Sequence, residues 1–212
     1  MKKYLCVKIK LYRIIFNARN KEAFTMSKKI IGIFVGSLRK ESYSKKIANF
    51  MCTAMPENIE MRMIDIGNLA IYNQDFDDEG NSPKEWETFR KECKELDGFL
   101  FITPEYNRSL PAVLKNALDV GSRPYGQSVW DGKPGAVIST SIGKISGFGA
   151  NHHLRQSAVF LNILMLQQPE AYIGDVASLL DEKGDLVDEG TQTFLQSFGS
   201  AFAQWIATCS KK

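Results

Sequence analysis

Long apolar runs alternate with periodic amphipathic stretches along this chain. Apolar residues run from Ile30 to Val35, interrupted only by Gly32, and again from Phe99 to Ile102. An apolar run of this length is typical of a strand that is buried on both faces, as in parallel sheets. The pattern therefore predicts strands at residues 30–35 and 99–103, and three more at residues 61–66, 135–140 and 170–173.

Between the predicted strands, apolar residues recur every three or four positions, which indicates helices with one buried face. Ile47, Met51 and Met55 show this spacing in the first such stretch. Ser82 and Pro83 are typical of an N-cap and a first helical residue, and they place the start of the second helix. The predicted helices span residues 44–55, 83–96, 112–120, 150–166 and 191–208, and loops fill residues 67–81, 121–134 and 174–190.

The order of these elements is a strand followed by a helix, repeated five times. That order predicts an α/β fold in which helices cover both faces of a parallel sheet. Five strands match the flavodoxin-like three-layer sandwich, with strand order 2-1-3-4-5. Ligands of such sheets bind beyond the carboxyl ends of the strands, near strands 1 and 3. We therefore expect the functional residues in the loops at 36–44, 104–111 and 141–149.

Composition changes this picture only at the N-terminus. The chain has 212 residues, of which 44% are hydrophobic, as expected of one globular domain. Residues 1–25 carry seven basic side chains and one acidic, whereas residues 26–212 carry 20 basic and 23 acidic. The formal net charge of +3 therefore comes from the first 25 residues. The rest of the chain has no basic excess that would indicate nucleic-acid binding.

Residues 1–25 are predicted to be an extension outside the folded domain. The segment begins like a secretory signal, but Lys8, Lys10 and Arg13 interrupt the stretch that should be apolar. We expect it to be disordered or loosely helical, or to result from an upstream start, with Met26 as the natural first residue. A basic amphipathic segment that binds a membrane surface is the alternative. Residues 26–212 are predicted to form the single domain.

Cysteine and histidine give no sign of a metal site. The four cysteines are scattered without paired spacing, which favours a reducing, cytoplasmic location over a disulfide framework or a zinc site. The only two histidines, His152 and His153, are adjacent and would point in different directions on a helix. No apolar run is long enough to span a membrane. We therefore expect neither a bound metal nor a membrane partner.

The segment after the first strand has the features of a phosphate-binding loop. The free amides of a helix's first turn and its dipole favour an anion. Ser37, Ser42 and Ser44 add hydroxyl groups, and Arg39 adds a guanidinium group. Neither G-x-G-x-x-G nor G-x-x-x-x-G-K-[ST] is present, and no cysteine lies in the loop. The loop therefore suits a phosphate that is bound rather than cleaved; a polar loop with an N-cap is the alternative.

Two motifs resemble those of the NADPH-dependent FMN reductase family, including its bacterial quinone and chromate reductase branch. They are Gly36-Ser37-Leu38-Arg39 and the segment from Thr103-Pro104-Glu105-Tyr106-Asn107 to Asp119. The resemblance covers about residues 29–208. It implies a flavodoxin-like domain that binds FMN and accepts hydride from NADPH or NADH. The electrons would then pass to a quinone or a similar small acceptor in a ping-pong scheme.

The resemblance also assigns residues to the cofactor. It implies no catalytic side chain, because the flavin carries the chemistry. Glu105 is expected to orient its loop rather than transfer protons, and Arg108 is our candidate for the NADPH phosphate. The phosphate and ribityl chain are assigned to Ser37, Arg39, Ser42, Tyr43 and Ser44, the ring to Pro104, Glu105, Tyr106 and Asn107, and a further flavin contact to Thr140.

The chain departs from the quinone and chromate reductase branch at one place. Members of that branch have an arginine and a tyrosine near the flavin at a tetramer contact, whereas this chain has Gly149 and His152. Glu170, the acidic partner in that contact, is present. The resemblance implies a homodimer or a homotetramer, and the departure leaves the polar contacts of the tetramer and the acceptor preference open.

Two other functions are alternatives to a reductase. A flavodoxin-type electron carrier would share the fold, but flavodoxins are usually strongly acidic and lack the Pro-Glu-Tyr-Asn loop. An FMN-binding regulatory protein would share the site itself. The sequence leaves open the physiological acceptor and the choice between NADPH and NADH.

Overall fold

The computed structural model describes residues 28–210, so the predicted extension at residues 1–25 lies outside it. A parallel sheet forms the middle layer, and its strand order is β2-β1-β3-β4-β5, with β6 also paired to β4. The predicted flavodoxin-like order is therefore confirmed. The strands are β1 (Lys29–Val35), β2 (Ile59–Ile64), β3 (Gly98–Pro104), β4 (Pro134–Thr140), β5 (Leu164–Met165) and β6 (Ala171–Ile173).

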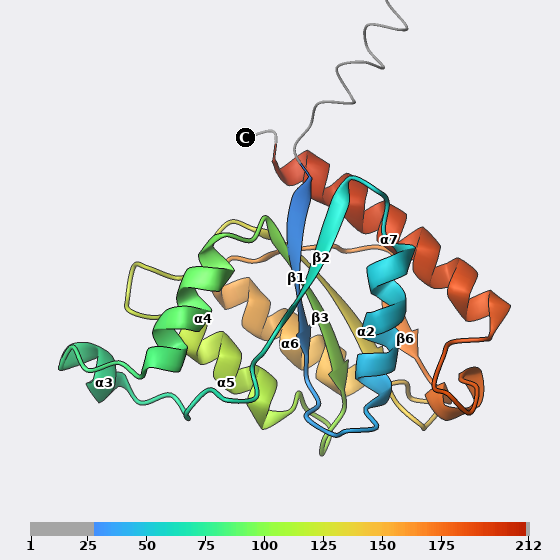
Figure 1. Ribbon diagram of the computed structural model, residues 1–212, viewed down its shortest axis with the longest axis horizontal. Coiled ribbons are helices and arrows are strands. Elements are labelled where there is room, and N and C mark those ends of the chain that lie inside the picture. Colours follow the sequence, from blue (N-terminus) through green and yellow to red (C-terminus); the bar gives the residue numbers. More distant parts are fainter. Residues whose placement is uncertain (1–27, 211–212) are drawn as a thin grey trace, which may run out of the picture.

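Helices cover both faces of the sheet (Figure 1). α2 and α7 pack on one face, and α4, α5 and α6 pack on the other. The carboxyl ends of β1 and β3 point to the same edge, at the bottom of the view in Figure 1. The helices are α2 (Tyr43–Ala54), α3 (Gln74–Asp78), α4 (Lys84–Lys94), α5 (Ala112–Gly121), α6 (Phe148–Phe160) and α7 (Glu189–Cys209), with a 3-10 turn, η2, at Val176–Leu179.

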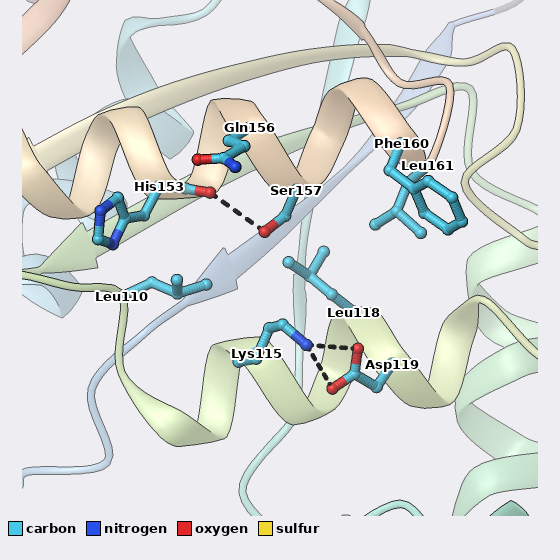
Figure 2. A pocket seen from close by; sticks show the side chains of 9 residues that line it. All are labelled: Leu110, Lys115, Leu118, Asp119, His153, Gln156, Ser157, Phe160 and Leu161. Carbon is cyan, nitrogen blue, oxygen red and sulfur yellow. Dashed lines mark hydrogen bonds and ion pairs between the residues drawn. The ribbon is translucent and has the colours of Figure 1, made fainter.

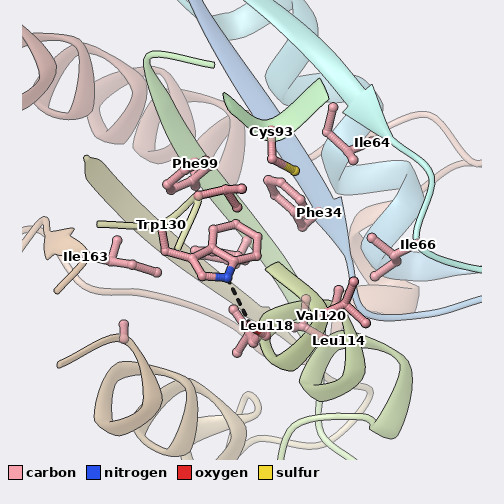
Figure 3. Close-up of a cluster of buried hydrophobic side chains, with 14 of the residues drawn as sticks. Phe34, Ile64, Ile66, Cys93, Phe99, Leu114, Leu118, Val120, Trp130 and Ile163 are labelled. Atoms are coloured by element: carbon pink, nitrogen blue, oxygen red, sulfur yellow. Dashed lines mark hydrogen bonds between the residues drawn. The ribbon is translucent and has the colours of Figure 1, made fainter. Parts of the chain in front are cut away.

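Each face of the sheet has its own hydrophobic core. The core under α4, α5 and α6 is rich in aromatic side chains, with Phe34, Phe99 and Trp130 fully buried (Figure 3). Trp130 comes from the predicted loop at residues 121–134, and its indole N–H donates to the Leu118 carbonyl at 3.0 Å. The core under α2 and α7 is aliphatic apart from Phe198 and Phe202. These two cores hold the strands rigidly, so that their carboxyl ends can position loops.

The predicted helix at residues 150–166 is wrong at both ends. It begins two residues earlier, at Phe148, and ends at Phe160. Asn162 follows in the left-handed region, with φ 54°, which is a common way for a helix to end. The chain then forms the short strand β5, and the single strand predicted at residues 170–173 is shorter, at Ala171–Ile173. The fifth strand position is thus shared by two short segments that pair with different parts of β4.

Smaller predictions also differ from the structure. The strand predicted at residues 61–66 lies two residues earlier, at Ile59–Ile64. The N-cap of α4 is Pro83, not Ser82. The Ser82 hydroxyl instead donates to Asp77 at 2.6 Å. Asp77 lies in α3, a short helix within the predicted loop at residues 67–81. The Ser82 side chain is therefore engaged by a residue five positions earlier in the chain, and the capping rule does not detect this contact.

Candidate functional site

A cavity of about 340 Å³ opens at the carboxyl ends of β1, β3 and β4. We call it the switch-point cavity. Its volume lies within the range of about 300–1,000 Å³ that is typical of small-molecule sites. All the predicted site residues except Asn107 line it. Ser141 and Ile142, from the loop expected at residues 141–149, and Val176, from outside the three expected loops, complete it. The predicted residues that line it are Ser37, Arg39, Ser42, Tyr43, Ser44, Pro104, Glu105, Tyr106 and Thr140.

The first turn of α2 forms one end of the cavity. Ser42 is the N-cap, and its Oγ accepts the Lys45 amide at 3.2 Å. The amides of Tyr43 and Ser44 have no acceptor within the helix, because they belong to its first turn. Together with the exposed Arg39 guanidinium, they create a positive field at this end. The two interpretations of this loop are therefore compatible: it is capped by Ser42, and it suits a phosphate.

A buried pair of hydroxyls joins α2 to the end of β4. The Oγ atoms of Ser44 and Thr140 are 2.7 Å apart, and the two residues are almost fully buried. Each hydroxyl has one proton and two lone pairs, so this bond leaves acceptor capacity on both. The pair fixes the distance between two elements that lie 96 residues apart in the chain. It can also accept a hydrogen bond from a hydroxyl of a bound ligand.

The loop after β3 forms the opposite wall. Tyr106 and Ser109 exchange two backbone hydrogen bonds of 3.0 Å, which close a tight turn. The two residues at the tip, Asn107 and Arg108, have φ of 50° and 66°. Asn107 is exposed, at the tip of this turn, and it does not line the cavity. The assignment of Asn107 to the flavin ring remains a prediction.

Glu105 anchors this loop to α6. Its Oε2 accepts the Ala150 amide at 3.1 Å, in the first turn of the helix. Its Oε1 lies 3.4 Å from the guanidinium of Arg108, which is itself largely exposed. A Cβ at Gly149 would lie 2.7 Å from the Arg108 carbonyl oxygen and 3.0 Å from Glu105 Oε2. Glycine at position 149 therefore allows the loop to contact the helix closely.

The arrangement is suited to binding rather than to proton transfer. The cavity has hydroxyls and amides at one end, and a wall formed by Pro104 and Tyr106 at the other. Its carboxylate, Glu105, already accepts from a helix amide. Pro104 lacks an amide and stiffens the wall. A ligand with a phosphate at one end and a flat ring at the other matches both ends of the cavity.

A second cavity, of about 410 Å³, lies between α5 and α6 (Figure 2). Its two charged groups neutralise each other, because Lys115 Nζ lies 2.7 Å from both carboxylate oxygens of Asp119. His153 Nδ1 is 2.9 Å from Ser109 Oγ, so this imidazole is also engaged. The remaining walls are mostly apolar, with Leu118, Phe160 and Leu161 among them. None of the predicted site residues lines this cavity.

His152, one of the two positions at which this chain departs from the resemblance, packs among aromatic side chains. His152 Nε2 is 3.0 Å from the Tyr172 hydroxyl, and the Phe148 and His152 rings lie 4.2 Å apart. Burial, followed by the hydrogen bond and the charge of Glu170, raises the pKa of the Tyr172 phenol. Of the two departing positions, His152 thus belongs to a small aromatic cluster with Phe148 and Tyr172, whereas Gly149 contacts the loop after β3.

The described residues show neither a metal cluster nor a membrane span. Among residues 28–210, no group of three or more His, Cys, Asp or Glu side chains could hold a metal ion. None of the helices in that range has the length and the apolar character needed to cross a membrane.

Comparisons with known proteins agree on one family. The family model for NADPH-dependent FMN reductase matches residues 29–178. A quinone reductase of Pseudomonas putida is 52% identical over 176 residues, which cover 83% of this chain and 94% of that protein. A 2-hydroxy-1,4-benzoquinone reductase of a Burkholderia species is 44% identical over 83% of this chain and 95% of its own length.

This chain is also similar to a solved structure of a flavoenzyme. The solved structure is that of a flavoenzyme NAD(P)H:(acceptor) oxidoreductase from Paracoccus denitrificans, which is similar to this chain with a TM-score of 0.79 and 38% sequence identity. The match covers 85% of this chain and 98% of that one. Flavodoxin from Pseudomonas aeruginosa matches less well, with a TM-score of 0.51 and 15% identity, and shows the fold alone.

Proposed function

This chain belongs to the NADPH-dependent FMN reductase family, and from that premise we propose that it uses FMN to reduce quinones at the expense of NAD(P)H. The observation that carries the proposal is the switch-point cavity, in which three loops bring together the residues that the family motifs indicate. FMN supplies the chemistry when bound, because it accepts a hydride from the nicotinamide and passes two electrons to the quinone.

We propose that the α2 end of the cavity binds the FMN phosphate. Arg39 offers a guanidinium fork, and the first-turn amides of α2 offer further donors. The paired hydroxyls of Ser44 and Thr140 support an assignment of these residues to the polar chain between the phosphate and the ring. Pro104 and Tyr106, at the other end of the cavity, are assigned to the ring. In this assignment the side chains bind and orient, and none of them transfers a proton.

We infer that the acceptor is a small molecule that reaches an open site. Tyr106 is 45% exposed and Ile142 is 69% exposed at the rim of the cavity, so the ring would be accessible from solvent. Both side chains are apolar enough to contact a flat quinone. The relatives named quinone reductase support this class of acceptor.

The test is a spectrum recorded under anaerobic conditions. We expect purified protein, loaded with FMN, to show a flavin band that bleaches when NADPH is added and recovers when a benzoquinone is added. Steady NADPH oxidation with excess quinone should follow. Flavin that binds but does not bleach would support an electron carrier or a regulatory protein. If FMN does not bind, the assignment of the switch-point cavity is wrong.

We further propose that the protein is a homodimer or homotetramer in the cytoplasm. Val159 and Phe160, at the end of α6, are 78% and 84% exposed beside the α5–α6 cavity. Apolar side chains this exposed are typical of association sites when they occur together. The scattered cysteines and the family resemblance support the location and the assembly.

Sedimentation velocity tests the assembly. Phe160→Glu should lower the sedimentation coefficient toward that of a monomer. The matched control, Val187→Glu, changes a half-exposed apolar residue near the start of α7 and should leave it unchanged. A wild-type monomer would contradict the proposal.

A further inference from the structure

A second cleft adjoins the switch-point cavity on the side of β2. Its volume is about 400 Å³, and it shares Ser37 and Arg39 with the switch-point cavity. The two hollows are therefore separated only by the loop after β1. We call the second one the β2-side cleft. Its other lining residues are Val35, Leu38, Lys45, Met63, Ile64, Asp65 and Ile66.

The position of this cleft in the sheet suggests a nucleotide. β1 and β2 run parallel and adjacent, with Phe34 opposite Ile64, so their carboxyl ends meet at the cleft. In dinucleotide-binding folds with the G-x-G-x-x-G fingerprint, an acid after the second strand accepts a hydrogen bond from the ribose 2′-hydroxyl, and a nearby cation accommodates a 2′-phosphate. This chain lacks the fingerprint and shares only the position of the acid. Asp65 is the first residue after β2. Lys45 belongs to the first turn of α2, and both residues line the cleft.

The charges in the cleft remain available to a ligand. Lys45 donates its backbone amide to Ser42, and its ammonium group has no ion pair among residues 28–210. The next lysine, Lys46, is instead paired with Glu41 at 3.1 Å. Asp65 Oδ1 accepts the Gly67 amide at 2.9 Å, which fixes the carboxylate and leaves Oδ2 as a further acceptor.

The walls of the cleft suit a flat apolar ring. Leu38 is 62% exposed and Met63 is 38% exposed, and both line the cleft. Small-molecule sites are lined mostly by apolar side chains, and such side chains can contact the faces of an adenine ring. The volume also falls in the range of about 300–1,000 Å³ for small-molecule sites.

We propose that the β2-side cleft binds the adenosine end of the nicotinamide donor, and that Lys45 and Asp65 set its preference between NADPH and NADH. Lys45 attracts the 2′-phosphate, which only NADPH carries, and it replaces the sequence-based candidate Arg108, which is paired with Glu105 and does not line the cleft. Asp65 repels that phosphate and accepts a hydrogen bond from the free 2′-hydroxyl of NADH. The nicotinamide end then extends over the shared loop toward the switch-point cavity. The inference rests on the proposed function, because it needs a nicotinamide donor.

Two substitutions should change the preference in opposite directions. The measured quantity is the ratio of kcat/KM for NADPH to kcat/KM for NADH, with FMN-loaded protein and a benzoquinone. Lys45→Gln should lower this ratio about fivefold, which is the effect of losing one partly exposed charge pair. Asp65→Asn should raise it by about the same factor, since asparagine keeps an oxygen for the Gly67 amide. The proposal would be overturned if neither substitution changed the ratio, or if both substitutions changed it in the same direction.

Lys40→Gln is the matched control. Lys40 is an exposed lysine of the same loop and does not line the cleft. This control should leave the ratio within twofold of the wild-type value. If it lowers the ratio as much as Lys45→Gln does, general charge rather than the cleft explains the effect, and the proposal is wrong.

Calorimetry with adenosine 2′,5′-bisphosphate gives a readout that does not depend on turnover. We expect the FMN-loaded wild-type protein to bind it, Lys45→Gln to bind it about fivefold more weakly, and the Lys40→Gln control to bind like wild type. Equal binding by all three proteins would overturn the inference while NADPH oxidation continues. Loss of NADPH oxidation in the wild type would instead contradict the proposed function, so the two failures are distinguishable.

Discussion

Arg39 borders both hollows and supplies the positive charge among the described residues that line the switch-point cavity. Arg39→Gln removes a charged donor but keeps a polar side chain of similar reach. A charge-assisted hydrogen bond contributes about 1.5–3 kcal/mol, so FMN binding should weaken about 10- to 100-fold. Riboflavin has no phosphate, and its affinity should change by less than about threefold. Titration of flavin fluorescence with both ligands measures the difference.

Arg62→Gln provides the control for this prediction. Arg62 lies on β2, lines neither hollow, and is 3.5 Å from Glu60. Its substitution should leave the affinity for both flavins unchanged. If Arg39→Gln weakens the binding of riboflavin as much as the binding of FMN, the FMN phosphate does not bind at Arg39.

Single residues of the site could be predicted only where they carry recognisable chemistry. The serines and Arg39 were found because hydroxyls and a guanidinium after a buried strand suit an anion. The contact between Ser44 and Thr140 could not be found, because it joins residues 96 positions apart. Ile142 lies in a loop that topology indicated, but its apolar side chain carries no chemistry that would single it out. Val176 lies outside the three expected loops, and its buried side chain is typical of any core.

The contact between the β3 loop and α6 depends on the absence of a side chain at residue 149. Gly149→Ala would force a backbone carbonyl and the Glu105 carboxylate away from the helix, because the new Cβ would lie 2.7 Å from the Arg108 oxygen. Overpacking of this kind costs about 1–3 kcal/mol of unfolding free energy. It should also weaken FMN binding, since Glu105 lines the cavity. Urea denaturation and flavin titration measure the two effects.

Gly190→Ala is the comparison for the same chemical change. Gly190 lies in the first turn of α7, and its Cβ would meet only Asp188 Oδ1 at 3.5 Å. Alanine favours a helix over glycine by about 0.5–1 kcal/mol. This variant should therefore be as stable as the wild type or more so. An equal loss of unfolding free energy in both variants would contradict the claim that close packing at residue 149 requires glycine.

α3 is attached to α4 by a largely buried ion pair. Arg90 lies 2.7 Å from both Asp77 oxygens, and the side chains of Arg90 and Asp77 are 10% and 4% exposed. The hydrogen bond from Arg90 lowers the pKa of the Asp77 carboxyl against the opposing effect of its burial. Asp77→Asn leaves the arginine without its charge partner and should cost about 3–5 kcal/mol of unfolding free energy.

The loss of unfolding free energy caused by Asp77→Asn should become smaller as pH falls. Because the carboxyl pKa is lower in the folded state, the unfolded chain binds the proton first as pH falls. The stabilisation is thus complete above the ordinary aspartate pKa of about 3.9 and is lost as pH falls through the lower folded value. The difference between wild type and Asp77→Asn should shrink below about pH 4. The neighbouring exposed control, Asp78→Asn, should show a small and constant difference in the same urea series.

At the scale of elements, the sequence identified most strands and helices but not all of their ends. A buried strand shows a continuous apolar run, and an amphipathic helix shows apolar residues every three to four positions, so both can be identified from sequence alone. The end of α6 depends instead on Asn162, whose left-handed conformation stops the helix. Asparagine at such an end is a weaker signal than glycine. The apolar residues that follow therefore extended the predicted helix to residue 166, although Leu164 and Met165 pair with β4.

At the scale of the whole molecule, the strand order followed from rules of connection rather than from any one residue. Alternating strands and helices with right-handed crossovers leave few arrangements, and the order 2-1-3-4-5 is one of them. That order brings together the loops after β1, β3 and β4, so the location of the site was predictable from topology. Which side chains touch within it was not, because tertiary packing decides this.

The assembly of the site from distant loops predicts how the molecule responds to its cofactor. A ligand that binds only the folded state stabilises it according to its concentration relative to Kd. At 100 times Kd, FMN should add about 2.7 kcal/mol and raise Tm by about 5–11 °C for a domain of this size. Unfolded chain cannot bind, because residues of three loops between Ser37 and Ser141 must be brought together.

Differential scanning calorimetry of the apoprotein, with FMN added stepwise, measures this shift. The Tm should rise with the logarithm of FMN concentration once the site is saturated. Arg39→Gln should reach the same Tm only at proportionally higher FMN concentration. Riboflavin at equal concentration should stabilise the wild type less than FMN does. A Tm that does not respond to FMN would mean that the folded state gains nothing from the flavin, and that the switch-point cavity serves another ligand.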